Sequence, residues 1–477
     1  MIRRLTVFVL VTVLIFSVIL TAGAERYNTL KRGSKGENVK TMQQALKDLG
    51  FYKGKIDGIY GKGTMNAVKA FQRKNKLKAD GVAGTKTLTK LYEADKDAEK
   101  EASAETEEES PGQQKDGIRQ ENVIPAEVCS FLESVVRNSG AACGTLVLSK
   151  NGNTFLTWSF GGVNEQTCFR IASITKWVTA IGLMTLYDQG KLDLDKDISS
   201  YLGFKVRNPA YPDVPITARM IMSHTSSLSA DATNYHPDWS RIGKNGYDPI
   251  FEKSIRPGTK YVYADYNGAL FGCLIEAISK QSVQNYMNTK VFRPLGLTAA
   301  YSPKFLPSGT DMKDLLSPQG KVQISVQKDR NRSYNNKADP KGNNGYTVGK
   351  LYINAESLTK LAQMMYNGGM LDGTRILKKE TVRLMETDQP LLAESRYGLS
   401  TVRLEQFDRG IWYGHQGRYS GLSSNIYYQR ETGITMALIM NGYEYKLTDN
   451  VVQPAATILT NMEKIETLCL GETSKKK

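Results

Sequence analysis

Cysteine is scarce in this chain of 477 residues, which has only five, at positions 129, 143, 168, 273 and 469. An odd number excludes a framework in which every cysteine is paired within the chain. Cys129 and Cys469 lie in apolar segments near the two ends of the larger folded region, so a bridge between them is one expectation. The other is that all five are small buried hydrophobic residues.

Long apolar runs are also nearly absent. The one clear run, Leu5 to Leu20, follows the basic start Met1–Arg4 and precedes the small residues Thr21–Ala24. This order is typical of a secretory signal, here residues 1–24 with cleavage after Ala24. An uncleaved anchor is the alternative, although the run is near the short limit for a membrane span. No later stretch is long and apolar enough to cross a membrane, so we expect a secreted, extracellular protein.

Acidic residues are fewer than basic ones, 48 against 63, and the two are unevenly distributed. Residues 93–117 hold 10 acidic and 3 basic residues and almost nothing apolar, which predicts a flexible acidic linker. Residues 25–92 hold 16 basic and 5 acidic residues. Such a surface attracts polyanions, which outside a cell are wall polymers or anionic lipid headgroups rather than nucleic acid. Lysine that only aids solubility is the alternative.

Residues 27–92 predict three amphipathic helices separated by two turns with the shared pattern Asp-Gly-x-x-Gly. The helices are expected over residues 37–49, 64–75 and 85–92. The stretch resembles the peptidoglycan-binding-domain-1 family, which implies an all-α three-helix module that binds peptide or glycan of peptidoglycan, and no metal-ligand spacing occurs in it. The matching residues are Leu30–Val39, Leu46, Leu49, Gly50, Asp57–Gly61, Ala70–Gln72 and Asp80–Gly84.

From residue 118 to residue 471 the composition is again that of a globular domain, followed by a basic tail, residues 472–477. Two pairs of strands are predicted, one around the turn Lys150–Asn153 and one near the end of the chain. Helices are expected to flank them, which favours an α+β domain with an antiparallel sheet. The strands are expected over residues 142–148, 154–160, 421–428 and 432–440, and the flanking helices over 125–139 and 449–467.

Ser173 and Lys176 lie three residues apart at the start of an apolar helix that is predicted to run to about Asp188 and to stop at Gly190. Three residues apart on a helix means one face. A serine hydroxyl is a poor nucleophile until a base takes its proton, and a lysine of lowered pKa can be that base. An N-capping serine beside a solvated lysine is the alternative.

Two later groups of residues supply further functions that such a site needs. Tyr263 and Asp265 precede an apolar helix over residues 269–278, and a phenol near a lysine can pass a proton to a leaving group. His415 precedes Gly417 at the start of a strand. We expect His415 to donate to an oxyanion or a substrate carboxylate, and Gly417 to let a substrate backbone approach.

In this order the motifs resemble the serine β-lactamase-like family, which includes class C β-lactamases, D,D-peptidases and related esterases. Ser173–Lys176 matches Ser-x-x-Lys, Tyr263–Asp265 stands where Tyr-x-Asn is usual, and His415–Gly417 stands where Lys-Thr-Gly or His-x-Gly is usual. The resemblance spans roughly residues 125–470. Supporting matches are Leu186–Asp195, Met222–Leu228 and Leu358–Gly369.

The resemblance implies a β-lactamase/transpeptidase-like domain, with an antiparallel sheet flanked by helices and a helical subdomain. It implies Ser173 as the acylated nucleophile, Lys176 as its base and Tyr263 as a proton shuttle. The backbone N–H groups of Ser173 and Arg418 would form the oxyanion hole. No metal and no organic cofactor are implied.

Two departures from the family pattern concern the substrate. Asp265 replaces an amide, and an ionised carboxylate only accepts hydrogen bonds; beside Lys176 it would also hold that lysine charged and hinder it as a base. His415 replaces a lysine, which predicts weaker binding of a C-terminal carboxylate unless Arg418 restores the charge. His224 and His236 are interpreted as structural. The segment 319–345, rich in Lys, Asn and Gly, is interpreted as an exposed mobile loop.

The sequence therefore predicts an exported, cell-wall-associated serine hydrolase that acts through an acyl-enzyme. A D,D-carboxypeptidase or D-amino-acid peptidase acting on peptidoglycan peptides is the first interpretation. An esterase acting on wall ester groups and a β-lactamase are alternatives within the same chemistry. An alternative of another class, which Asp265 favours, is a wall-binding or β-lactam-sensing protein that does not turn over.

Overall fold

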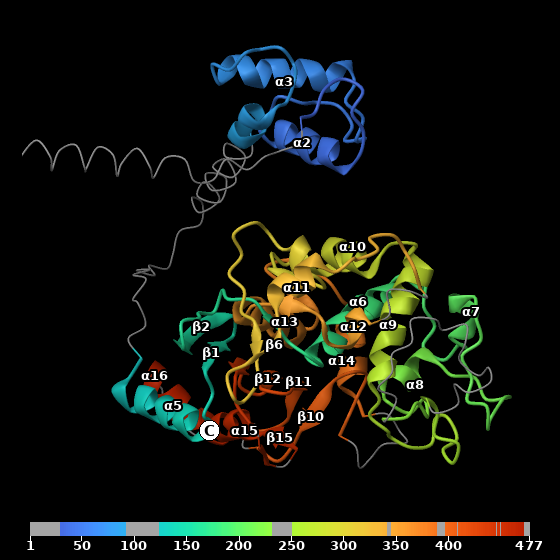
Figure 1. Cartoon of the computed structure of the whole chain (residues 1–477), viewed down its shortest axis with the longest axis vertical. Helices are drawn as coiled ribbons and strands as arrows, with labels where there is room; N and C mark the ends of the chain where they lie inside the picture. Colours follow the sequence, from blue (N-terminus) through green and yellow to red (C-terminus); the bar gives the residue numbers. More distant parts are fainter. Residues whose placement is uncertain are drawn as a thin grey trace, which may run out of the picture. The chain divides into compact units, whose positions relative to one another are not determined.

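The structure is a computed structural model that describes residues 29–91, 124–230, 250–340, 345–388, 396–407, 409–444, 446–448 and 450–471. The chain divides into two compact units, residues 1–119 and 120–477, which are described separately (Figure 1). The predicted signal (1–24), acidic linker (93–117) and basic tail (472–477) lie outside the described residues, as does His236, and the domain boundaries stay predictions. No helix within the described ranges is both long and apolar enough to span a membrane.

The first unit is helical, as predicted. It contains α2 (Glu37–Asp48), α3 (Lys62–Lys74) and a third helical segment at residues 85–91. Apolar residues at helical spacing turn inward from all three helices and fill one core. The buried core residues of the helices are Val39, Met42, Ala45, Leu46, Ala67, Val68, Phe71, Leu88 and Leu91.

Each of the two turns in this unit is held by a buried glutamine. The Gln43 side-chain nitrogen donates to Asp57 Oδ1 at 3.0 Å and to Thr64 Oγ1 at 2.9 Å, and its oxygen accepts the Gly58 N–H at 2.9 Å. Gln72 repeats this arrangement one helix later. Its partners are Asp80, Thr87 and Gly81. The shared Asp-Gly-x-x-Gly pattern is therefore one structural element used twice, each time around one amide side chain.

Replacing Gln43 with Met is expected to destabilise the first unit by about 2 kcal/mol, because it leaves the buried Gly58 N–H without its acceptor and removes the hydrogen bonds that Gln43 donates to Asp57 and Thr64. Native-state hydrogen exchange on peptides from residues 29–91 measures this free energy. The matched control is Gln44→Met, since Gln44 is exposed on the same helix. Equal protection in the two variants would contradict the role assigned to Gln43.

The second unit is built on a six-stranded antiparallel sheet with the strand order β10-β11-β12-β13-β1-β2. Strands from the two ends of the unit's sequence meet inside this sheet, where β1 pairs with β13 and Cys143 lies opposite Asn441. Both predicted strand pairs are present. The strands are β1 (Cys143–Lys150), β2 (Asn153–Phe160), β10 (Val402–Leu404), β11 (Trp412–Tyr419), β12 (Leu422–Gln429) and β13 (Ile434–Asn441).

Helices pack on both faces of the sheet. Successive residues of a strand point to opposite faces, and the central strands carry apolar residues on each face. Leu146 and Leu438 belong to the core shared with α5 (Ala126–Ser139), α15 (Gln453–Thr460) and α16 (Met462–Leu470). Val147 and Ile439 belong to the core shared with α6 (Ile174–Asp188), α9 (Asp265–Ser279) and α13 (Ala355–Tyr366). Figure 1 shows α5, α15 and α16 on one side of the strands and α6, α9 and α13 on the other.

Two expectations about the end of this unit need correction. The helix predicted over residues 449–467 is two helices, α15 and α16, because Asn461 leaves the helical conformation between them, and the short pair β14 (Leu447–Thr448) and β15 (Val451–Val452) precedes them. Of the two expectations for the cysteines, the Cys129–Cys469 bridge is also wrong, since all five are free; three of the five are buried, and Cys129 and Cys469 are partly exposed. Packing of the two helices that carry them does not bring two sulfur atoms to bonding geometry.

The remaining elements are short, and most of them lie between β3 and β7 along the chain. They are β3 (Phe169–Arg170), α7 (Ser199–Leu202), α8 (Ala218–Met222), α10 (Val283–Met287), the π-helix η4 (Asn288–Phe292), β4 (Ala299–Ala300), the 3₁₀-helix η5 (Pro303–Phe305), β5 (Leu315–Leu316), β6 (Val322–Ile324), α11 (Val326–Asn331), α12 (Tyr346–Gly349), β7 (Tyr352–Ile353), β8 (Met370–Leu371), β9 (Thr374–Arg375) and α14 (Lys379–Glu386).

Candidate active site

Ser173 lies where the chain passes from β3 into α6, the most deeply buried helix of the second unit. Every residue of α6 from Ile174 to Leu186 is buried, so packing on all sides fixes the position of its first turn. Lys176 follows one turn later, and its Nζ lies 3.1 Å from Ser173 Oγ. The structure therefore brings the predicted nucleophile and the predicted base into direct hydrogen-bonding contact.

The Lys176 side chain is fully buried and has three acceptors within 3.1 Å of its Nζ, in addition to a hydrogen-bonding interaction with Tyr263. Besides Ser173 Oγ, these are the Val348 carbonyl oxygen at 2.8 Å and Asp265 Oδ1 at 2.7 Å. Gly268 on α9 makes room for the lysine stem, since a Cβ there would lie 2.7 Å from Lys176 Cγ. The three N–H bonds of an ammonium group match these three acceptors, which is how a buried charge is tolerated.

The pKa of Lys176 is raised above its ordinary value. Burial lowers it, but the neighbouring Tyr263 and Asp265 raise it by more. If Lys176 loses a proton, the neutral amine can still donate to Val348 and Asp265 while its lone pair accepts the Ser173 hydroxyl. The geometry therefore suits a general base, whereas the charge of Asp265 opposes the deprotonation that a base needs.

Tyr263 stands beside Lys176 and is supported from behind by His224. The two rings stack with centroids 4.2 Å apart, and Lys176 Nζ lies 5.5 Å from the Tyr263 ring centroid. His224 Nδ1 lies 3.1 Å from the Ala264 N–H and 3.0 Å from Asn267 Nδ2. Because both groups donate, Nδ1 is the acceptor and the proton is on Nε2.

His224 is thus a positioning residue for Tyr263. Burial, reinforced by Lys176 and His415, lowers its pKa well below the ordinary value, so the ring is neutral. The structural interpretation of His224 from the sequence gave no indication of this contact. The local signal was the polar run Ser223–Ser227, which is buried; buried polar runs need specific partners, which here lie at the start of α9.

His415 is placed differently from the expectation. Its Nδ1 lies 2.7 Å from the Gln416 carbonyl oxygen and its Nε2 lies 3.0 Å from Tyr397 Oη. Burial first, and then Lys176, lower its pKa to about 3. A buried neutral ring with both nitrogens engaged carries no charge for a substrate carboxylate, so the expected contact of His415 with substrate has no support in this geometry.

Gly417 brings strand β11 close to the backbone of the nucleophile. A Cβ at this position would lie 2.2 Å from the Ile171 carbonyl oxygen and 3.0 Å from the Ser173 nitrogen. Ser424 on the neighbouring strand β12 donates to the same Ile171 carbonyl at 2.7 Å and ties the sheet to the start of α6. Only glycine allows this approach. The structure thus places Gly417 against the nucleophile's own backbone, whereas we expected it to admit a substrate backbone.

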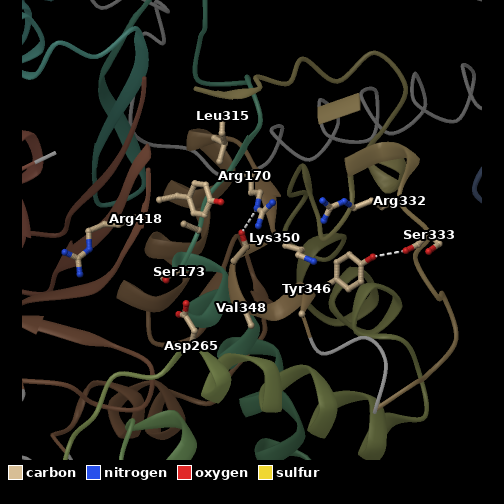
Figure 2. A pocket seen from close by; sticks show the side chains of 14 residues that line it. Arg170, Ser173, Asp265, Leu315, Arg332, Ser333, Tyr346, Val348, Lys350 and Arg418 are labelled. Atoms are coloured by element: carbon tan, nitrogen blue, oxygen red, sulfur yellow. Dashed lines mark hydrogen bonds between the residues drawn. The ribbon is translucent and has the colours of Figure 1, made fainter. Parts of the chain in front are cut away.

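A cavity of about 500 Å³ opens beside Ser173 and Asp265 (Figure 2). Arg418 lines this cavity, so its side chain lies on the cavity side of β11. Arg332 and Ser333 line it as well, so part of segment 319–345 borders the cavity, although both residues are exposed as expected for this segment. Within that segment, β6 and α11 are ordered elements. The lining residues are Arg170, Ala172, Ser173, Asp265, Leu315, Arg332, Ser333, Gly345, Tyr346, Val348, Gly349, Lys350, Arg418 and Tyr419.

Sequence reasoning missed Arg170 and Lys350 as cavity residues. Arg170 directly precedes the nucleophile turn, and Lys350 follows α12, whose Val348 carbonyl binds Lys176. No group of three or more His, Cys, Asp or Glu that could hold a metal ion occurs in the described part of the chain.

Comparison with known families identifies the second unit. Residues 130–454 match the β-lactamase family. The chain belongs to the β-lactamase family. Residues 35–91 match the peptidoglycan binding domain family, so the first unit is a helical module of that kind. Both resemblances noted from the sequence motifs are confirmed, as is the combination of a small helical module with an α+β domain.

Individual relatives are distant or cover little of the chain. Protein flp of Staphylococcus aureus strain MRSA252 is 24% identical over 187 residues, 36% of this chain and 37% of that protein, so the chain spans about a third of its length. A spore cortex-lytic enzyme of Bacillus cereus is 48% identical over 67 residues, 14% of this chain and 26% of that enzyme.

Solved structures with the same fold include a class C β-lactamase, with a TM-score of 0.58, 14% identity and coverage of 76% of this chain and 100% of that one. A penicillin-binding protein homologue from Pyrococcus abyssi has a TM-score of 0.56 and 20% identity, covering 73% and 78%. A D-amino acid amidase from Ochrobactrum anthropi has a TM-score of 0.53 and 18% identity, covering 72% and 99%. At these identities the likeness establishes the fold.

Replacing Gly417 with Ala is expected to abolish acylation of Ser173 and to cost about 1–3 kcal/mol of stability, because the added methyl overlaps the Ile171 carbonyl and pushes β11 away. Penicillin labelling followed by mass spectrometry, together with thermal unfolding, measures both effects. Gly61→Ala is the control, because no atom lies within 4 Å of a Cβ there. Full labelling of Gly417→Ala would contradict the assigned close approach.

Proposed function

We propose that the protein is an exported, cell-wall-associated serine hydrolase that cleaves peptides of peptidoglycan next to a D-amino acid, as a D,D-carboxypeptidase or D-amino-acid peptidase. The observation that carries this proposal is the 3.1 Å contact between Ser173 Oγ and the Nζ of a fully buried lysine at the edge of a cavity. A serine next to a buried amine is the arrangement that nucleophilic acyl transfer needs.

In the proposed reaction, neutral Lys176 takes the Ser173 proton while Oγ attacks the scissile carbonyl carbon. The backbone N–H groups of Ser173 and Arg418 stabilise the oxyanion. The C–N bond then breaks, and the proton passes from Lys176 through Tyr263 to the leaving amine. Water attacks the acyl-enzyme in the second half-reaction, with the same groups acting in reverse, and restores Ser173.

The substrate class rests on the pairing of two units in one chain. A peptidoglycan-binding module would hold the catalytic unit at the cell wall and raise the local concentration of wall peptides. The relatives point the same way, since the first unit is similar to part of a cortex-lytic enzyme and the fold is that of a D-amino acid amidase. Export rests on the signal-like pattern of residues 1–24.

A second candidate is a wall-binding or β-lactam-sensing protein that is acylated without turnover. The 2.7 Å ion pair between Lys176 and Asp265 favours it, because this pair holds the base in its charged form. Breaking an ion pair with one fully buried partner costs free energy. This cost adds to the deprotonation of Lys176, which both half-reactions require. The two candidates differ in turnover and share the nucleophile.

Intact-mass analysis of the full chain incubated with a penicillin and, separately, with a D-Ala-D-Ala stem pentapeptide tests the proposal. We expect a penicilloyl adduct on the wild type, none on Ser173→Ala, and release of D-alanine from the pentapeptide. An adduct without D-alanine release would move the assignment to an esterase or to the sensing protein. Absence of both an adduct and release, on peptide and ester substrates alike, would contradict the hydrolase assignment.

Replacing Asp265 with Asn is expected to raise the rate of Ser173 acylation at pH 7 by about tenfold or more. Removing a carboxylate from the contact lowers the pKa of Lys176, and each unit gives ten times more neutral amine. In the wild type the rate should keep rising with pH through the alkaline range, because the pKa of Lys176 is raised. In Asp265→Asn it should level off at lower pH.

Stopped-flow acylation by a chromogenic cephalosporin, recorded as a function of pH, measures both effects. The matched control is Asp195→Asn, which removes a surface carboxylate that pairs with Arg219. An unchanged pH profile in Asp265→Asn would remove the main argument for the protein that does not turn over.

A further inference from the structure

One wall of the cavity beside Ser173 is formed by three cations from separate segments. Arg170 comes from the end of β3, Arg332 follows α11 and Lys350 follows α12, and all three line the cavity. Figure 2 shows Ser173 and Asp265 between Arg418 on one side and Lys350 with Arg332 on the other. The nucleophile thus faces a cavity with positive charge at both ends.

Two of these three cations, Arg170 and Arg332, pair with one carboxylate. Asp329, which is buried, lies 3.3 Å from Arg170 Nη1 and 3.4 Å from Arg332 Nε, and it also accepts a hydrogen bond from Tyr352. Lys350 forms no ion pair with any carboxylate of the described residues; its Nζ lies 4.8 Å from the centre of the Tyr346 ring. Among the described residues, the one acidic residue that lines the cavity is Asp265, which already pairs with Lys176. This wall therefore carries uncompensated positive charge.

The wall is held in place by contacts that do not involve a ligand. Arg170 Nε donates to the Gly349 carbonyl at 2.9 Å, and Tyr346 donates to the Ser333 carbonyl at 2.9 Å while its ring packs edge-on against Tyr334. Burial and the repulsion from Arg170 and Arg332 lower the pKa of Lys350. Holding cations close together costs free energy, as the lowered pKa of Lys350 indicates. Such a group marks a functional site more often than a structural one.

We propose that Lys350 and Arg332, with Arg170 behind them, bind a carboxylate of the substrate peptide at the end of the cavity opposite Arg418. The inference rests on the proposed function, because it takes peptides as the substrate class, and it adds that the preferred peptide is acidic on the Lys350 side of the scissile bond. A carboxylate there would pair with Lys350, which has no ion-pair partner among the described residues, in a partly buried setting where such charge-assisted hydrogen bonds are strong.

Calorimetric titration of the full-length Ser173→Ala chain with two dipeptides tests this site. The probes are acetyl-D-Glu-D-Ala and acetyl-D-Gln-D-Ala, which differ only by a carboxylate and its isosteric amide. We expect the glutamyl peptide to bind about tenfold more tightly. Lys350→Met and, separately, Arg332→Met in the same background should reduce this preference to about twofold or less. Arg332 is largely exposed and its replacement puts little at risk in folding.

The matched control is Lys328→Met, which removes one positive charge from the exposed side of α11 outside the cavity and should keep the full preference. Equal affinity for the two peptides, or a preference that survives both Lys350→Met and Arg332→Met, would overturn the proposal. A failure of the proposed function is seen separately, as absence of acylation on Ser173, because the titration requires binding only and uses a chain without the nucleophile.

Discussion

The buried ammonium group of Lys176 is the feature on which the rest of the catalytic unit depends. A charge without solvent is tolerated only if each N–H has an acceptor. Here the acceptors come from three places: the start of α6, the end of α12 and the start of α9. These segments must therefore stay in one arrangement for Lys176 to remain buried, and the same arrangement holds the nucleophile, its base and the cavity together.

Two glycines make this arrangement sterically feasible. Gly268 lets α9 pack against the stem of Lys176, and Gly417 lets the sheet reach the backbone of Ser173. At each position, the space that a side chain would take is occupied by atoms of the site, which are the Lys176 stem at Gly268 and the backbone of Ile171 and Ser173 at Gly417. A Cβ would lie 2.7 Å from Lys176 Cγ at Gly268 and 2.2 Å from the Ile171 carbonyl oxygen at Gly417, so a larger residue at either position requires these atoms to move. Close packing on the side of the site away from the cavity thus determines where Ser173 and Lys176 lie relative to the cavity.

The two buried histidines of the site are neutral, whereas several residues that border the cavity are charged. His224 and His415 are buried and neutral behind Tyr263 and β11. Ahead of them, the cavity is bordered by Arg418 at one end and by Lys350 and Arg332 at the other. Asp265 sits at the boundary, paired with Lys176 and 42% exposed in its side chain. In the described part of the chain it is the one carboxylate that lines the cavity, and its charge acts directly on Lys176.

The sequence by itself determined what depends on neighbours along the chain. The spacing of Ser173 and Lys176 predicted a shared helical face, the repeated Asp-Gly-x-x-Gly turns predicted the helical module, and the turn signal at residues 150–153 predicted a strand pair. Asp265 was also singled out, because a carboxylate stands where the family has an amide.

Only the tertiary structure decided which distant groups meet. Val348 reaches Lys176 across 172 residues, His224 supports Tyr263, and Lys350 joins Arg170 in one wall. His415 was predicted to contact substrate, but in the structure its two ring nitrogens contact Tyr397 Oη and the Gln416 carbonyl oxygen. The physical reason is that helix and turn signals are local, whereas burial and the pairing of polar groups are set by packing between segments far apart in the chain.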